Sequence, residues 1–366
     1  MNDITKSIGI ALSGGGIRAA IFHLGVLKYM AENKMLGRIA RISSVSGASL
    51  AIGLIYSHNS LRWPTDNEYT NTALPKIRDV LVKHNIPKIA VFRLLYSPYL
   101  WNKKVNLLSK VISDHWGITG SIMNIGETPK WYINCTTYET GKRFRFSQCD
   151  MGDYTIGYIR NPQVSLSDAI SASAGFPIFI GPYCLKTNQN WEKSQYVNEG
   201  EHNYNGTYLH LWDGGVYDNL GIESVFKPDN GGQLCEGVDF IVVSNASASI
   251  MNENRTTGFS HKKLKRLLEI SRDQNQALRS RMLIEYIRRT QKGVYLKIGR
   301  SAQFITSKSG ANGELSKYLT GKCISDDEAE KVRDYKTTLN RPSEEDFDLI
   351  LRHGYEVAMC TYMCYQ

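Results

Sequence analysis

Three short groups of residues in this chain have the types and spacing expected of nucleophilic catalysis. The first is the run Gly14-Gly15-Gly16, followed by Arg18, which lies between an apolar run and a segment with helical spacing. Glycines let the backbone approach a ligand closely, and the N–H groups at a helix N-terminus point at an anion. The run is therefore typical of a dinucleotide-binding turn, of an oxyanion hole, or of a tight turn without chemistry.

The dinucleotide interpretation is only partly supported. Gly14, Gly16 and Ala19 match the pattern G-x-G-x-x-A, whereas the phosphate-binding pattern G-x-x-x-x-G-K-[ST] is absent. A dinucleotide site also needs an acidic residue at the end of the second strand, about 20 residues further on. The predicted second strand ends in Ser43-Ser44-Val45 and carries no carboxylate there. The glycine run alone leaves the other two interpretations open.

The second group contains a candidate nucleophile, Ser46, in the run Ser44-Val-Ser-Gly-Ala-Ser49, where a strand gives way to a helix. This is the setting of a nucleophile elbow, a sharp turn that projects its serine. The strict pattern G-x-S-x-G is not satisfied, because Ser44 and Ala48 replace the two glycines. Both side chains are small enough for a sharp turn. A strand-to-helix turn of small residues without catalysis is the alternative.

The third group contains a candidate base. A serine is a weak nucleophile unless a base lies within hydrogen-bond reach, yet no histidine of this chain stands in an exposed turn between glycines. Asp213 follows a predicted strand and precedes Gly214-Gly215, so its carboxylate could reach across a site with little steric cover. The alternative for this group is a plain β-turn, since Asp and Gly are favoured turn residues.

An alternation of apolar runs and helical segments positions these groups. The apolar run Ile8 to Leu12 predicts a strand that is buried on both faces, and residues 39–45 predict a second strand. Helical spacing follows each of them, which is the opening of an α/β fold. Further strands are expected at 131–135, 143–148, 208–212, 240–244 and 293–298, and helices at 165–173 and 261–290, with irregular helices between 60 and 125.

Together these groups resemble the motifs of the patatin-like phospholipase family. Gly14 to Arg18 resembles its G-G-G-x-R motif, Ser46 its nucleophile, and Asp213-Gly-Gly215 its D-G-[GA] motif. The resemblance extends over about residues 5 to 360, although the segment between 60 and 125 matches poorly. Further similar segments lie at 131–141, 166–177, 213–223 and 341–355.

The resemblance implies a fold and a site. The fold is an α/β three-layer sandwich with a central, mostly parallel sheet flanked by helices. It forms a single domain over 5–366, with a catalytic core at about 5–245 and a basic helix and C-terminal extension at about 255–366. The site is a Ser46–Asp213 dyad without histidine. The backbone of Gly14, Gly15 and Gly16 forms the oxyanion hole. Arg18 either contacts the lipid phosphate or supports the loop.

The function that the resemblance implies is hydrolysis of carboxylic esters of glycerophospholipids, of the phospholipase A or lysophospholipase type, through an acyl-Ser46 intermediate. Phospholipid or lysophospholipid is the expected substrate, and no metal or cofactor is expected. Two alternatives share the fold: a non-catalytic lipid-binding or signalling module, and a gated membrane-degrading effector in bacterial defence. Because Ser44 replaces the first glycine of the strict elbow pattern, the sequence does not decide how tight the turn at Ser46 is.

Composition excludes several other classes of protein. The 366 residues are 42% hydrophobic and 22% charged, which is typical of a globular chain and not of a disordered or collagen-like one. Seven cysteines without a C-x-x-C pair fit neither a zinc site nor a disulfide framework. The apolar stretch 86–101 contains Lys88 and Arg93 and is too short to span a membrane. Without a recognisable signal peptide, we expect a cytoplasmic or membrane-peripheral protein.

The excess positive charge is concentrated in one segment. The chain carries 44 Lys and Arg against 35 Asp and Glu, a net charge of +9, and residues 255–300 alone hold 13 against 3, a net charge of +10. A basic amphipathic helix within 262–289 could lie on an anionic membrane surface. It could also be a solvated outer face, or pair with the acidic stretches 326–330 and 344–348. Nucleic acid is not expected, because aromatic residues do not alternate with the cations.

Overall fold

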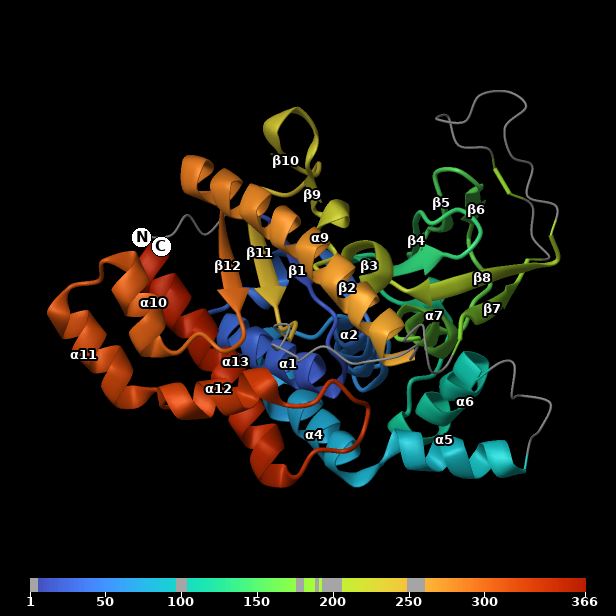
Figure 1. The fold of residues 1–366 in the computed structure, drawn as a ribbon, viewed down its shortest axis with the longest axis horizontal. Coiled ribbons are helices and arrows are strands. Elements are labelled where there is room, and N and C mark those ends of the chain that lie inside the picture. The colour runs from blue at the N-terminus through green and yellow to red at the C-terminus, as the bar shows by residue number, and fades with distance from the viewer. Residues whose placement is uncertain (1–5, 97–103, 176–180, 188–190, 193–205, 249–260) are drawn as a thin grey trace.

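The computed structural model describes residues 6–96, 104–175, 181–187, 191–192, 206–248 and 261–366. Five parallel strands form the centre of its main sheet, in the order β12-β11-β1-β2-β3 (Figure 1). Their bounds are β1 (Ile8–Leu12), β2 (Ile39–Val45), β3 (Lys130–Thr137), β11 (Phe240–Asn245) and β12 (Gly293–Lys297). Every residue of β1 and β11 is buried, as expected for parallel strands covered on both faces.

An antiparallel arm extends this sheet beyond β3. Its strands are β4 (Arg143–Phe146), β5 (Asp150–Asp153), β6 (Gly157–Arg160), β7 (Tyr183–Lys186) and β8 (Tyr208–Asp213). Both β4 and β8 pair with β3. Two short strands, β9 (Phe226–Lys227) and β10 (Gln233–Leu234), form a separate hairpin. The predicted α/β class is confirmed, and the sheet is parallel where it carries the first two motifs.

The pairing of β3 brings two distant parts of the sequence together. Asn134 of β3 lies opposite Val45 at the end of β2, in parallel register. The next residue, Cys135, lies opposite Asp213 at the end of β8, in antiparallel register. The ends of β2 and β8 therefore meet beside the same stretch of β3, although 167 residues separate Ser46 from Asp213 in the chain.

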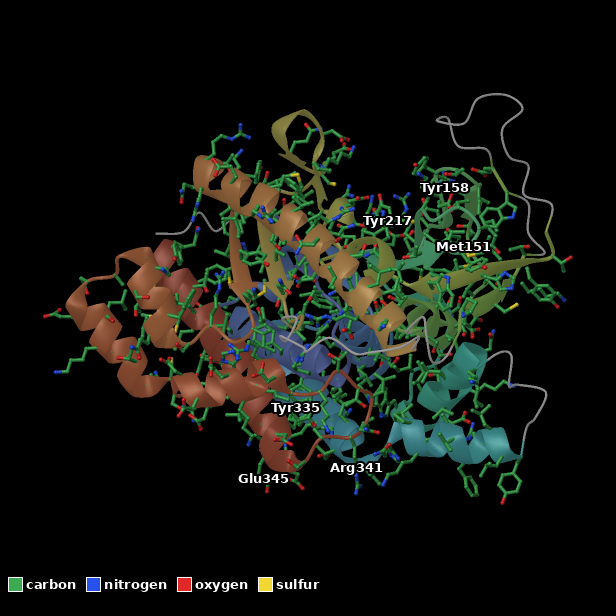
Figure 2. The ribbon with its side chains drawn as sticks, viewed as in Figure 1. Met151, Tyr158, Tyr217, Tyr335, Arg341 and Glu345 are labelled. Carbon is green, nitrogen blue, oxygen red and sulfur yellow. The ribbon has the colours of Figure 1, made fainter. Side chains whose placement is uncertain are left out.

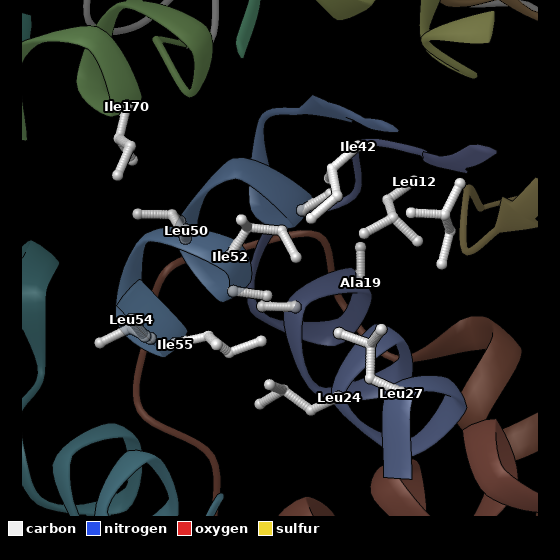
Figure 3. Close-up of a cluster of buried hydrophobic side chains, with 14 of the residues drawn as sticks. Leu12, Ala19, Leu24, Leu27, Ile42, Leu50, Ile52, Leu54, Ile55 and Ile170 are labelled. Carbon is white, nitrogen blue, oxygen red and sulfur yellow. The ribbon is translucent and has the colours of Figure 1, made fainter. Parts of the chain in front are cut away.

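Helices cover both faces of the sheet and complete three layers. On one face, Ile10 and Leu12 pack with the apolar side chains of α1 (Gly16–Glu32) and α2 (Gly47–Ser57), as Figure 3 shows around Leu12. On the other face, Ala11 and Val243 pack with Leu283 of α9 (His261–Thr290). Successive strand residues point to opposite faces, so β1 contributes to both layers. In Figure 1, α9 crosses over the parallel strands.

The remaining helices surround this core. Among the described residues they are α3 (Asp66–Glu68), α4 (Leu74–Lys83), α5 (Ile86–Leu95), α6 (Lys104–Trp116), α7 (Leu166–Ser173), α8 (Gly215–Asp218), α10 (Ala302–Ser309), α11 (Gly313–Lys322), α12 (Asp326–Asp334) and α13 (Glu344–Tyr365). The predicted helices within 60–125 are confirmed. No described helix is long and apolar enough to cross a membrane.

The C-terminal helix α13 packs directly on α1. The two backbones touch, because a Cβ atom on Gly25 would lie 2.0 Å from the carbonyl oxygen of Leu351, and one on Gly354 would lie 2.1 Å from that of Phe22. Phe347 of α13 is fully buried in the same apolar core as α1. Because the extension shares this core, we infer that residues 5–366 fold as a single domain.

Candidate active site

Ser46 occupies a strained turn between β2 and α2. β2 ends at Val45 and α2 begins at Gly47, and Ser46 itself has φ 53° and ψ −117°. A positive φ is uncommon for a residue with a side chain and persists only where the surroundings enforce it. This conformation points the side chain out of the sheet edge, and Ser46 lines the cavity described below. The geometry is that of a nucleophile elbow.

Two close backbone contacts enforce this turn. A Cβ atom on Gly47 would lie 2.1 Å from the carbonyl oxygen of Gly16, so only glycine fits between the elbow and the glycine run. A Cβ atom on Gly14 would lie 3.1 Å from Cβ of Ser46. The elbow and the glycine run are therefore packed against each other with no side chain between their backbones.

A network of buried hydroxyl groups supports the elbow from behind. The Ser46 N–H donates to Oγ of Ser173 (3.0 Å), and this hydroxyl donates to the carbonyl oxygen of Asn134 (2.7 Å). Oγ of Ser44 lies 2.9 Å from Oγ of Ser49 and accepts from the indole N–H of Trp131 (2.8 Å). Ser44 thus fits the tight elbow and holds it to β3. Sequence reasoning missed Ser173 and Asn134, although both lie in segments that resemble the family.

Asp213 is buried beside the elbow. It is 5% exposed at the end of β8, and its Oδ1 accepts a hydrogen bond from the N–H of Gly215 (2.7 Å). Ser46 and Asp213 both line the cavity described below. Burial raises the pKa of Asp213 to about 6, while the Gly215 N–H, the Ser46 hydroxyl and the charge of Arg272 each lower this pKa. The carboxylate is therefore mostly ionised at pH 7 and can still bind a proton.

The glycine run offers two backbone donors next to Ser46. Gly15 and Gly16 have φ values of 151° and 64°, which favour glycine. No described residue accepts a hydrogen bond from their N–H groups. The N–H of Gly14, by contrast, already donates to the carbonyl oxygen of Asn219 (3.1 Å). Of the three glycines predicted for the oxyanion hole, only Gly15 and Gly16 keep an unused donor.

Both terminal nitrogens of Arg18 donate to backbone and hydroxyl acceptors, whereas its Nε is buried without a described partner. The side chain is 1% exposed, and its Nη2 donates to the carbonyl oxygen of Ala246 (3.1 Å) and to Oγ1 of Thr337 (3.3 Å). Its Nη1 donates to the carbonyl oxygens of Arg333 and Tyr335; Figure 2 labels Tyr335 in the segment before α13. These contacts match the predicted loop-support role. A phosphate-binding role for Arg18 would require them to break.

Two histidines, His23 and His353, are buried in the core. His23 is buried in α1, with its ring nitrogens 2.9 Å from Oγ of Ser244 and 2.9 Å from the carbonyl oxygen of Ser13. Burial lowers the pKa of His23 to about 4 and that of His353 to about 3. No histidine of the described chain lines the cavity around Ser46. Within the described residues, no group of three His, Cys, Asp or Glu side chains is placed to hold a metal ion.

The cavity in front of Ser46 and Asp213 is lined in part by α9. Its volume is about 380 Å³, and Ser46, Asp213 and Gly15 form one wall. The opposite wall comes from α9 and includes Leu268, Glu269, Ser271, Arg272 and Asn275. Sequence reasoning assigned this helix to the protein surface, because nothing in its own sequence shows that it crosses the dyad.

Comparisons with known proteins agree with this geometry. The chain belongs to the patatin-like phospholipase family: the family model "Patatin-like phospholipase" matches residues 10–226. Human GIVD cytosolic phospholipase A2 has the same fold, with a TM-score of 0.53 and 13% sequence identity, over 99% of this chain and 60% of that chain. VipD from Legionella pneumophila aligns with a TM-score of 0.40 and 15% identity, over 98% of this chain and 67% of that chain. No curated protein matches the chain.

Proposed function

We propose that this protein is a lipid acyl hydrolase that cleaves carboxylic ester bonds of glycerophospholipids, of the phospholipase A or lysophospholipase type, through an acyl-Ser46 intermediate. The observation that carries the proposal is Ser46, held in a strained elbow at the wall of a cavity that the buried Asp213 also lines. A non-catalytic lipid-binding module of the same fold would have no use for this strain or for a buried carboxylate. Family membership and the phospholipase fold support the choice of a lipid ester.

In the acylation step, Asp213 accepts the hydroxyl proton while Oγ of Ser46 attacks the carbonyl carbon of the ester. The N–H groups of Gly15 and Gly16 stabilise the oxyanion of the tetrahedral intermediate. The N-terminal end of α2, which begins directly after Ser46, favours the same negative charge. When the carbon–oxygen bond of the ester breaks, Asp213 returns the proton to the leaving alcohol.

In the deacylation step, Asp213 accepts a proton from a water molecule, and the resulting hydroxide attacks the acyl-Ser46 carbonyl. The same two N–H groups stabilise the second oxyanion. The proton then passes from Asp213 to Oγ of Ser46 as the fatty acid leaves. No step requires a metal ion or an organic cofactor.

A fluorophosphonate probe tests the nucleophile. We expect the wild-type protein to be labelled covalently and Ser46→Ala to show no labelling, because only an activated serine hydroxyl displaces the fluoride. Ser57→Ala is a matched control, since Ser57 lies at the far end of the same helix α2 and its hydroxyl makes no hydrogen bond to a described residue. Labelling that persists in Ser46→Ala would place the nucleophile elsewhere.

We further propose that the N-terminal half of α9 docks on an anionic membrane surface, as predicted for 262–289. Leu267, Leu268 and Ile270 are 62%, 46% and 41% exposed, and Leu268 also lines the cavity. Exposed apolar side chains at the mouth of a lipid site favour contact with a bilayer. Lys263 and Arg266 add positive charge nearby. The side chains of residues 261, 262, 264 and 265 lie outside the described residues.

The described ion pairs give no support to the alternative in which the acidic stretches neutralise this helix. Glu344 and Asp348 pair with Arg78 of α4, at 3.1 Å and 2.8 Å. Among the described ion pairs of α9, Arg279 pairs with Glu223 at 2.7 Å and with Asp218. Both of these carboxylates lie outside the acidic stretches 326–330 and 344–348. In the N-terminal part of α9, the described cations Lys263 and Arg266 form no ion pair with another described residue. A cytoplasmic or membrane-peripheral location stays a prediction.

Vesicle co-sedimentation tests the docking surface. We expect binding to vesicles containing phosphatidylserine at low salt, release at high salt, and at least about tenfold weaker binding for the double variant Lys263→Glu/Arg266→Glu, since each cation near the surface contributes roughly 1 kcal/mol. The control is Lys308→Glu/Lys317→Glu, which makes the same charge change on exposed residues of α10 and α11. Vesicle binding that changes neither with the salt concentration nor in the Lys263→Glu/Arg266→Glu variant would contradict the proposal.

A further inference from the structure

The helix α9 is anchored so that one of its turns faces the dyad. Nη1 of Arg279 donates to Oε1 of Glu223 (2.7 Å), and its guanidinium lies over the ring of Tyr217, 5.2 Å from the centroid. Figure 2 labels Tyr217 beside α9. One turn earlier in the helix, Gln276 donates to Oδ1 of Asn245 at the end of β11 (3.3 Å). These contacts hold the preceding turn, which carries Arg272, over the cavity.

Arg272 is a positively charged residue of the cavity lining that has no role in the mechanism proposed above. It is half-buried and lines the cavity opposite Ser46, and it makes no hydrogen bond or ion pair with any other described residue. Arg18 also lines the cavity, but its terminal nitrogens are occupied by four acceptors. The charge of Arg272 lowers the pKa of both Asp213 and Arg18, which places it within electrostatic reach of the dyad.

Leaving a guanidinium half-buried and unpaired is unfavourable, so an anionic ligand is the expected partner. A guanidinium presents a planar fork of donors that matches the oxygen atoms of a phosphate. In a glycerophospholipid, the phosphate and the ester groups are attached to the same three-carbon unit. A cavity of about 380 Å³ with Ser46 on one wall and Arg272 on the other can hold both groups of one molecule.

From this juxtaposition we propose that Arg272 binds the phosphate group of the substrate while Ser46 attacks its ester, and that Arg272 thereby selects phosphate-bearing lipids over uncharged acylglycerols. The proposal rests on the proposed function, since it names the substrate class of the same site. Residue 272 lies outside the span 10–226 that the family model matches, so the feature belongs to this chain and not to the shared motifs.

Arg272→Gln tests the proposal with a pair of substrates that share one acyl chain, lysophosphatidylcholine and monoacylglycerol, in uncharged detergent micelles. We expect kcat/KM for lysophosphatidylcholine to fall about 10- to 100-fold, chiefly through KM, because a charge-assisted bidentate contact is lost. For monoacylglycerol we expect less than a twofold change. The assay is run at pH 8, where Asp213, with a pKa of about 6, stays ionised in both proteins.

Arg281→Gln is the matched control. Arg281 is an exposed residue of the same helix that donates only to the carbonyl oxygen of Ala277 among its described partners, so the variant loses the same charge away from the cavity. We expect it to leave both substrates unaffected. Arg272→Lys, which keeps the charge but loses the fork, should fall between the wild type and Arg272→Gln for lysophosphatidylcholine.

The outcomes separate the two proposals. If Arg272→Gln lowered kcat/KM equally for both substrates and a higher pH restored it, Arg272 would act only through the ionisation of Asp213. Either that result or an unchanged preference for lysophosphatidylcholine over monoacylglycerol would overturn phosphate recognition. Wild-type protein that hydrolyses neither substrate overturns the proposed function itself. Hydrolysis of both substrates with a preference that Arg272→Gln does not change overturns only the role of Arg272.

Discussion

Asp213→Asn is expected to lower kcat/KM for any ester on the order of 10⁴-fold at pH 8, because an amide cannot accept the proton of Ser46. In the wild-type protein we expect kcat/KM to rise with pH, to reach half its maximum near pH 6, and to level off above pH 7. The reason is that only the ionised form of Asp213 is a base, and burial raises its pKa to about 6. A short-chain chromogenic ester, assayed from pH 5 to pH 8.5, measures both effects.

The same substitution is expected to stabilise the fold at high pH. The pKa of Asp213 is about 6 in the folded protein, above the value of 3.8 for an unperturbed Asp. A group of this kind stabilises the native state fully below its unfolded pKa, and that stabilisation is lost as pH rises through the folded pKa. At pH 8 the buried charge therefore costs up to about 3 kcal/mol, at 1.36 kcal/mol per pKa unit. Asp213→Asn avoids this cost.

Urea unfolding of the wild type and of Asp213→Asn, at pH 5 and at pH 8, measures the difference. We expect the variant to be more stable than the wild type at both pH values, with the larger difference at pH 8, because the loss begins above the unfolded pKa of 3.8 and is complete above the folded pKa of about 6. A variant that loses activity and is also less stable at pH 8 would show that hydrogen bonds to the carboxylate outweigh its desolvation. The predicted combination, an inactive protein that is more stable, is the expected signature of a residue retained for catalysis at a cost in stability.

Gly47→Ala is expected to lower kcat/KM at least about 100-fold, because the added Cβ would lie 2.1 Å from the backbone carbonyl oxygen of Gly16. Backbone atoms cannot move aside as the end of a side chain can, so the elbow and the glycine run must separate. That movement displaces the N–H groups of Gly15 and Gly16 from the Ser46 nucleophile. Losing one oxyanion donor typically costs about 10² to 10³ in rate.

The control for this prediction is Gly37→Ala, at a glycine where a Cβ atom would meet nothing within 4 Å. We expect that variant to keep wild-type activity. The rate of fluorophosphonate labelling gives a second readout, since it reports the nucleophile and the oxyanion donors without product release. Activity of Gly47→Ala within tenfold of the wild type would mean that the two backbones separate easily, and that their contact does not maintain the site.

Local features of the chain were sufficient to predict the parallel strands and the elbow. Residues 8–12 and 39–45 are apolar runs of strand length, and each is followed by small residues and then by helical spacing. Such signals depend on neighbours within a few positions, and the structure places β1 and β2 at these residues. The strands β5, β6 and β7 were not predicted, because they are short and pair with an edge of the sheet that the sequence does not reveal.

The meeting of Ser46 with Asp213 depends on pairing between strands far apart in the chain. β3 aligns Val45 and Asp213 beside its consecutive residues Asn134 and Cys135, which no local pattern encodes. The resemblance to a family could propose the dyad, but the burial that raises the pKa of Asp213 is a property of the packed structure. The same holds for Gly14, whose N–H is taken by the carbonyl of Asn219.

By itself, the sequence determined the α/β class, the turn chemistry of Gly14 to Gly16, and the identity of the residues able to act as nucleophile and base. Tertiary structure alone decided that α9 lines the cavity that contains Ser46, that the terminal nitrogens of Arg18 donate to acceptors in two separate segments, and that Arg272 is left unpaired among the described residues. The physical reason is the distance along the chain over which each effect acts. Backbone conformation and side-chain chemistry are set by near neighbours, whereas desolvation, pairing and cavity shape arise only when distant segments pack together.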